Sequence, residues 1–206
     1  MNIFLNQHSF LNAIFRSYPC TLPIMPIIIY IFNKNKYIIA LCVGHYLVQL
    51  SVPICKDVIA YPIGKYLSKK YNIDDFPIIG RFKRPNNAIN CGCFYVSEDN
   101  ISTSEGMPSG HSMLASFASI FIYYYFVNEY NVTGEIKFLV CMIFAVFTIY
   151  MMYSRVLMNC HTIQQTIIGA FIGLVMGHYY YYYVRNLIQT TNKKNELDDI
   201  KNLNNI

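Results

Sequence analysis

The sequence is poor in charge. Charged residues make up 13% of its 206 residues and hydrophobic residues 54%, whereas an ordinary soluble domain carries about 25% charged residues. The mean hydropathy is +0.30. These values exclude a disordered chain and argue against an ordinary soluble enzyme. They favour one domain of a polytopic membrane protein, because the length suffices for one domain of ordinary size.

Other features are also lacking. The net charge is +5, yet there is no basic low-complexity arm, so a nucleic-acid partner is disfavoured and the positive charge calls for a phosphate ligand or a membrane surface. The seven cysteines do not form a secreted disulfide framework, because Cys42, Cys55 and Cys141 lie inside apolar runs. The Cys91 and Cys93 pair has the wrong spacing for common zinc sites. A basic region is missing from the extreme N-terminus, so we expect no cleavable signal peptide.

Apolar residues come in blocks long enough to form membrane helices at about 1.5 Å per residue. The blocks cover residues 19–32, 37–67, 111–127, 138–153 and 163–184. The block 37–67 is interrupted by prolines and charges, so it predicts either two helices or one broken helix. We therefore expect an all-α, polytopic helical bundle of five or six membrane helices, the first being the least distinct.

The blocks divide the chain into three parts. Residues 1–18 form a mixed N-terminal segment, residues 19–185 a membrane-embedded domain, and residues 186–206 a polar tail, which we expect to be frayed and cytosolic.

Two repeated patterns have structural interpretations. Gly169, Gly173 and Gly177 are spaced by four residues and share one helix face, which permits close helix packing. The tyrosine runs 123–125 and 179–183 each end a predicted helix on the same side of the membrane. We interpret them as an interfacial belt.

Lys56 and Asp57 lie within an apolar stretch. Charges there are expensive and can be functional. A helix break beside Pro53 explains them at least as well.

Three polar clusters stand out. The first is Arg81–Pro85 with two lysines upstream, the second is Pro108–His111 at the start of a helix, and the third is Ser154 and Arg155 followed by His161. Counting spans places all three on one side of the membrane.

The clusters contain what phosphoryl transfer requires. Arg84 and Arg155 can each supply bidentate donors to a phosphate dianion. A helix that starts after Ser-Gly offers free backbone N–H groups to an anion. Two histidines suit a two-step transfer, in which one attacks phosphorus and the other protonates the leaving oxygen. Gln165 lies one helical turn after His161, where it can accept a hydrogen bond from the imidazole and fix its tautomer.

These residues resemble the three-part signature of the type 2 phosphatidic acid phosphatase superfamily, which consists of integral-membrane lipid phosphatases and related enzymes. The resemblance rests on Arg-Pro, then Pro-Ser-Gly-His, then Ser-Arg-x5-His, and it spans about residues 70–165. It implies that His161 is the nucleophile and His111 the general acid. It further implies neither cofactor nor metal. The residues implied to hold the phosphoryl oxygens are Lys70, Arg84, Pro108, Ser109, Gly110, Ser154 and Arg155.

The sequence departs from the family pattern at two places. The family has a lysine seven positions before Arg84, where this chain has Pro77, and an insertion of about seven residues would restore Lys70 to that role. Lys69 and Lys83 are the alternatives. The second departure is Gln165, since most members have an aspartate that orients the nucleophile. An amide stabilises an imidazolium less than a carboxylate does.

The pattern His161-Thr162-x-x-Gln165 resembles the dolichyl diphosphatase branch of this family. That resemblance implies hydrolysis of dolichyl diphosphate to dolichyl phosphate on the luminal face of the endoplasmic reticulum, which recycles the carrier for protein N-glycosylation. The expected partners are a polyisoprenoid diphosphate lipid and the bilayer, with no obligatory protein partner. The sequons at Asn100 and Asn131 fall on opposite sides, Asn100 being luminal.

Two alternatives stay open. A phosphatase of phosphatidate or sphingoid phosphate would have the same site. An inactive family member that acts as a membrane scaffold would explain the displaced lysine and the missing aspartate.

Overall fold

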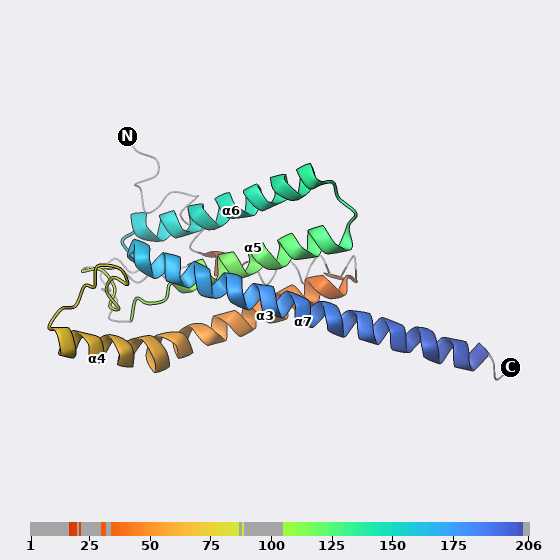
Figure 1. Ribbon diagram of the computed structural model, residues 1–206, viewed down its shortest axis with the longest axis horizontal. Helices are drawn as coiled ribbons and strands as arrows, with labels where there is room; N and C mark the ends of the chain where they lie inside the picture. Colours follow the sequence, from red (N-terminus) through yellow and green to blue (C-terminus); the bar gives the residue numbers. More distant parts are fainter. Residues whose placement is uncertain are drawn as a thin grey trace.

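The computed structural model describes residues 17–19, 21, 30–31, 34–86, 88 and 105–203, with the backbone alone for residues 199 and 201–203. Apart from two isolated β-bridges, the regular structure of this part is helical, so the all-α prediction is confirmed. Figure 1 shows α5 at the centre, in contact with α7, α6 and α3. The helices are α3 (Lys36–Pro53), the π-helix η2 (Ile54–Ala60), α4 (Tyr61–Tyr71), α5 (Gly110–Glu129), α6 (Gly134–Leu157) and α7 (Ile163–Leu203).

The ambiguous block forms one continuous helical rod, Lys36–Tyr71. It begins at Asn35, whose side chain accepts a hydrogen bond from the Tyr37 amide at 2.9 Å. Pro53 ends α3, and the π-helix η2 follows directly. Because proline has no N–H group, it removes one helical hydrogen bond, and the chain continues here in the wider π form. The rod ends at Asn72, which is left-handed with a φ of 53°.

The glycine stripe of α7 packs against α5. A methyl group at Gly169, Gly173 or Gly177 would collide with α5. The backbone atoms they face lie on successive turns, at Ser109, Met113 and Phe117. The stripe therefore has the packing role that its spacing predicted, and it fixes α7 against α5 along three turns.

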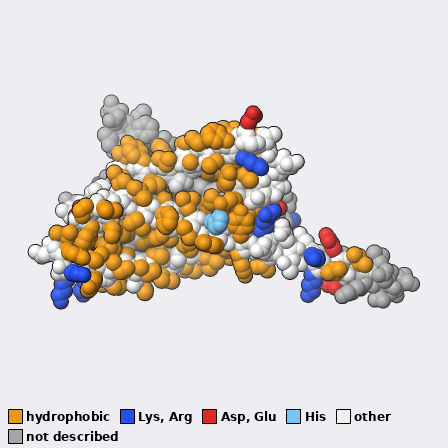
Figure 2. Space-filling model, in the orientation of Figure 1, with side chains coloured by type: hydrophobic (Ala, Val, Ile, Leu, Met, Phe, Trp, Pro, Cys, Tyr) orange, Lys and Arg blue, Asp and Glu red, His pale blue; other side chains and the backbone are white. Residues whose placement is uncertain are grey.

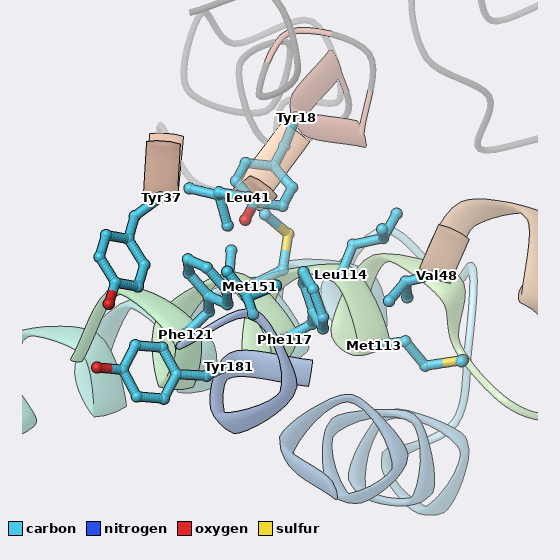
Figure 3. Close-up of a cluster of buried hydrophobic side chains, with 13 residues drawn as sticks. Tyr18, Tyr37, Leu41, Val48, Met113, Leu114, Phe117, Phe121, Met151 and Tyr181 are labelled. Atoms are coloured by element: carbon cyan, nitrogen blue, oxygen red, sulfur yellow. The ribbon is translucent and has the colours of Figure 1, made fainter. Parts of the chain in front are cut away.

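The core lies around α5. Figure 3 shows Phe117 and Phe121 of α5 next to each other, with Tyr181 of α7 beside Phe121. The aromatic ring of Tyr181 lies edge-on to that of Phe121, with the ring centroids 5.5 Å apart. Part of the tyrosine run 179–183 is thus core rather than belt, because Tyr181 is fully buried whereas Tyr179 is 71% exposed.

Two helices in the described part are long and apolar enough to cross a membrane, namely Lys36–Tyr71 and α6. Half of the residues of α6 are exposed, and Figure 2 shows hydrophobic side chains over much of the visible face of the bundle. The helix α5 contains serine, histidine and tyrosine, and α7 contains glutamine, threonine, histidine and tyrosine, all of which lower the hydropathy of these helices.

Of the expectations about the two ends of the chain, one is untested and one differs from the structure. The predicted first helix, 19–32, lies almost wholly outside the described residues. The polar tail is not frayed in the backbone, because α7 continues to Leu203. No proline or glycine follows Gly177, so nothing in the sequence breaks this helix.

Candidate active site

The predicted clusters meet at one end of the bundle, where α5 and α7 begin and α6 ends (Figure 1). The Ser109 amide donates to the Gln165 carbonyl at 3.1 Å, which joins the starts of α5 and α7. The amides of Gly106 and Met107 both donate to the Phe82 carbonyl, at 2.9 and 3.1 Å. These bonds bring the Arg-Pro segment, 108–111 and the start of α7 together, although they lie far apart in the sequence.

Gln165 is fully buried and its side-chain amide is fully hydrogen-bonded. Its Nε2 donates to the carbonyl oxygens of Arg81 and Lys83, both at 2.8 Å. Its Oε1 accepts from the Thr162 amide at 3.1 Å and lies 3.1 Å from Nδ1 of His161. The predicted contact between Gln165 and His161 is therefore present, and the same amide also holds the segment before Arg84.

This arrangement fixes the tautomer of His161. Because Nε2 of Gln165 faces two carbonyl oxygens, its Oε1 must be the atom that faces the imidazole. An amide oxygen only accepts, so Nδ1 of His161 carries the hydrogen and Nε2 retains its lone pair. The nitrogen with the lone pair is the one that can attack phosphorus.

The surroundings of His161 favour the neutral imidazole. Burial has the largest effect on its pKa, followed by the positive charges of Arg84 and Lys56, and Arg155 adds to them. Together they hold the pKa well below the ordinary value of 6.5, although the hydrogen bond to Gln165 acts in the opposite direction. At neutral pH the ring is therefore in its nucleophilic form.

Arg84 and Arg155 both lie at this end of the bundle. Arg84 is half-buried, and its Nη1 donates to the Cys160 carbonyl at 3.3 Å. Burial lowers the pKa of its guanidinium. Arg155 is fully buried in the last turn of α6, with its Nε 3.4 Å from Oγ of Ser154 and its Nη2 3.8 Å from Sδ of Met158. A fully buried guanidinium requires an anion or several acceptors nearby, which fits a phosphate site.

The start of α5 has the features of an anion site. Pro108 is buried and follows a cis peptide bond, and Ser109 is the N-cap residue without a side-chain capping bond. The Ser109 hydroxyl instead accepts from the Ser112 hydroxyl at 3.1 Å. The first backbone N–H groups of α5 are therefore not claimed by a cap. His111 is the second residue of this helix and is half-buried.

Lys70 is not brought to this cluster. It is exposed near the end of α4, and its ammonium lies over the rings of Tyr66 and Tyr71, at 5.9 and 5.4 Å from their centroids. The side chains of the two alternatives, Lys69 and Lys83, are exposed as well. The short insertion assumed from the sequence does not return Lys70 to the site, because α4 and the following loop carry it away.

Lys56 was not among the residues predicted for the site, yet it lies at its edge. Its Nζ donates to the Glu105 carbonyl at 2.8 Å, and its charge acts on His161. The signal was present in the sequence as a charge inside an apolar run, but the proline nearby offered a structural explanation.

The comparisons with known proteins agree with this geometry. The family model of the PAP2 superfamily matches residues 76–189, more than half of the chain. No curated protein and no solved structure matches the chain. The matched region contains the site residues His111, His161, Arg84, Arg155 and Gln165. The chain therefore belongs to the PAP2 superfamily, whose members are metal-independent phosphatases of the lipid phosphate type.

Proposed function

We propose that the protein hydrolyses dolichyl diphosphate to dolichyl phosphate and inorganic phosphate. The observation that carries this proposal is the Gln165 amide and its bonds to His161, Arg81 and Lys83. Most members of the family have an aspartate at this position, and His-Thr-x-x-Gln is typical of the dolichyl diphosphatase branch. In this chain a carboxylate would face two carbonyl oxygens, so the amide is the side chain that fits.

The first step is transfer of the terminal phosphoryl group to the enzyme. Nε2 of His161 attacks the terminal phosphorus in line, and the bond from phosphorus to the bridging oxygen breaks. His111 donates a proton to the departing dolichyl phosphate. Arg84, Arg155 and the backbone N–H groups at the start of α5 stabilise the charge on the equatorial oxygens.

The second step releases phosphate. Water attacks the phosphohistidine, and His111 now accepts the proton from that water. The bond from phosphorus to nitrogen breaks and leaves inorganic phosphate and neutral His161. The Nδ1 hydrogen stays on the ring throughout, held by Gln165.

The length of the rod between its first two lysines supports a site at the membrane edge. Lys36 at the start of α3 and Lys56 in η2 lie 20 positions apart, which at 1.5 Å per residue is about 30 Å, the thickness of the hydrocarbon core. In the proposed topology the site lies at one face of the membrane bundle. A long isoprenoid chain can then stay in the bilayer while its diphosphate reaches the histidines.

An apolar groove between α5, α6 and α7 is suited to the hydrocarbon chain. It encloses about 310 Å³. One end is formed by Met152, one turn before Arg155, so the groove leads away from the phosphate site. Residues from all three helices line it, among them Ile120, Tyr123, Phe144, Ala145 and Leu174.

A disulfide supports the luminal orientation of the site. Cys160, the residue before His161, is fully buried and disulfide-bonded. Disulfides persist in oxidising compartments such as the lumen of the endoplasmic reticulum and are rare in the cytosol. The active site would therefore face the lumen.

The test is phosphate release by the purified protein in detergent with EDTA present. Dolichyl diphosphate, phosphatidate and sphingosine phosphate are offered separately, with His161→Ala as the control. We expect release from the diphosphate and its loss in the variant. Release chiefly from the two monoesters would assign the site to general lipid phosphate hydrolysis instead, and no release from any substrate by folded protein would favour the scaffold.

A further inference from the structure

One face of the rod Lys36–Tyr71 lies over the active site. Val52 faces Gly110, where its Cγ1 would lie 3.0 Å from an added Cβ. One turn later Lys56 contacts the Glu105 carbonyl, and a turn beyond that Ala60 belongs to the same cluster as Phe82 and Met107. The spacing of four residues places Val52, Lys56 and Ala60 on one face.

Lys56 is therefore directed at the loops that build the site. Glu105 comes immediately before Gly106, and Gly106 lies against the side chain of Gln165. Lys56 is itself part of the π-helical segment Ile54–Ala60. Single π turns inside helices are frequent at functional sites.

The charge of the Lys56 ammonium acts on the nucleophile. The charges of Arg84, Lys56 and Arg155 all lower the pKa of His161. Lys56, Arg84 and Arg155 carry positive charge in a largely buried region where each loses hydration, and Asp57 and Glu105 offset part of the charge of Lys56. A phosphoryl group carries the negative charge that compensates such a cluster. The Glu105 carbonyl takes one of the three N–H donors of Lys56, and an ammonium has two more for phosphoryl oxygens.

Lys56 precedes Arg84 by 28 positions. The chain between them leaves the site along α4 and returns through a turn bridged at Phe76 and Gly80. On its return Phe82 packs against Gly64, so the detour closes on the same helix face that carries Lys56. The residues between Lys56 and Arg84 therefore extend away from the site and return to it, so that both ends of this segment lie at the site.

We propose that Lys56 binds the phosphoryl oxygens of the substrate, in the role that the sequence pattern would give to Lys70. This proposal rests on the proposed function only in that the substrate is a lipid phosphate. Together with Arg84, Lys56 stabilises the negative charge on the phosphoryl group during transfer, and it does so from the side of the site that faces the membrane.

The experiment compares Lys56→Met with Lys65→Met, a matched substitution of an exposed lysine nine positions along the same rod. We expect Lys56→Met to lower kcat/KM about 100-fold or more, the usual effect of removing one donor to a developing oxyanion. Lys65→Met is expected to stay near the wild-type value, and Lys56→Arg to recover part of the loss. Size-exclusion profiles and thermal unfolding show whether each variant is folded.

Two further measurements separate a direct role from a structural one. Loss of one positive charge near His161 should raise its pKa, so the acid limb of kcat/KM should move to higher pH in Lys56→Met but not in Lys65→Met. Orthovanadate binding, followed by thermal stabilisation in detergent, should weaken at least tenfold in Lys56→Met. This binding requires no turnover, so it tests Lys56 even if dolichyl diphosphate is not hydrolysed.

Wild-type kinetics and vanadate affinity in Lys56→Met would overturn the assignment. Loss of both in Lys70→Met, with Lys56→Met unaffected, would return the role to Lys70. Absence of diphosphate hydrolysis by the wild type, with vanadate affinity that still depends on Lys56, would refute the proposed substrate and leave Lys56 in the phosphate site.

Discussion

Replacing Gln165 by glutamate tests the amide network most sharply, because the change alters charge and donors but hardly alters shape. An ionised glutamate has no hydrogen to donate, so the carbonyls of Arg81 and Lys83 lose their 2.8 Å bonds and face a carboxylate oxygen. Each buried group left unsatisfied costs about 1–3 kcal/mol. The two together predict a loss of about 2–6 kcal/mol in stability.

For a chain of this size, 1 kcal/mol corresponds to about 2–4 °C in Tm. Gln165→Glu should therefore lower Tm by at least about 4 °C. The decrease should be smaller at acidic pH, where a protonated carboxyl keeps one donor. The assay is thermal unfolding in detergent between pH 5 and 8, with phosphate release measured alongside it.

The matched control is Gln164→Glu, the same substitution at the neighbouring, half-buried position, which packs against Gly80. It should change Tm and activity little, because no hydrogen bond described above depends on it. Unchanged Tm and activity in Gln165→Glu would refute the reasoning. Such a result would mean that the Gln165 amide contributes no more to stability and activity than a carboxylate at this position does in other family members.

The remaining predictions concern the nucleophile, the groove, the helix contact and the topology. The pKa of His161 is held well below 6.5, so kcat/KM should show no loss from protonation of this ring between pH 7 and 6. A limb with its midpoint at 6.5 in the wild type that moves to higher pH in Lys56→Met would contradict this. Ala145→Phe narrows the groove, so kcat/KM should fall for dolichyl diphosphate but stay near wild type for farnesyl diphosphate, whose isoprenoid chain is short. Equal effects on both substrates would show that the groove does not bind the long hydrocarbon chain. Gly173→Leu drives a side chain into α5 at Met113 and Ser116, so folded protein recovered in detergent should fall severalfold, whereas Gly134→Leu meets open space and should be tolerated. With a luminal site, endoglycosidase-sensitive glycan should be found on Asn100 and not on Asn131, and the reverse pattern would invert the topology.

The helices could be predicted because the apolar blocks and glycine spacing are local features. The i to i+4 spacing of His161 and Gln165 likewise fixed their contact, since one helical turn is independent of the rest of the fold. The continuous rod was not predicted, because Pro53 suggested two helices or one broken helix, whereas the chain continues past it through a π-helical segment. The helical tail was not expected, because its polarity suggested fraying although it contains no helix breaker.

The site was harder to predict where it depends on contacts between distant segments. The bonds from Gln165 to Arg81 and Lys83 join residues more than 80 positions apart. Lys56 reaches Glu105 across 49 positions. Motif spacing favoured Lys70 because it lies only 14 positions before Arg84, whereas α4 extends away from the site and leaves Lys70 exposed near its end.

The central claim is that His161 carries the phosphoryl group, and rapid quenching tests it most directly. The purified protein is mixed with dolichyl diphosphate labelled with ³²P at the terminal phosphate, denatured within milliseconds and digested. The account predicts an acid-labile, base-stable label on the peptide that contains His161, absent from His161→Ala and lost when unlabelled substrate is added in excess before quenching. Full turnover with no label on the protein, or with the label on a different residue, would contradict it.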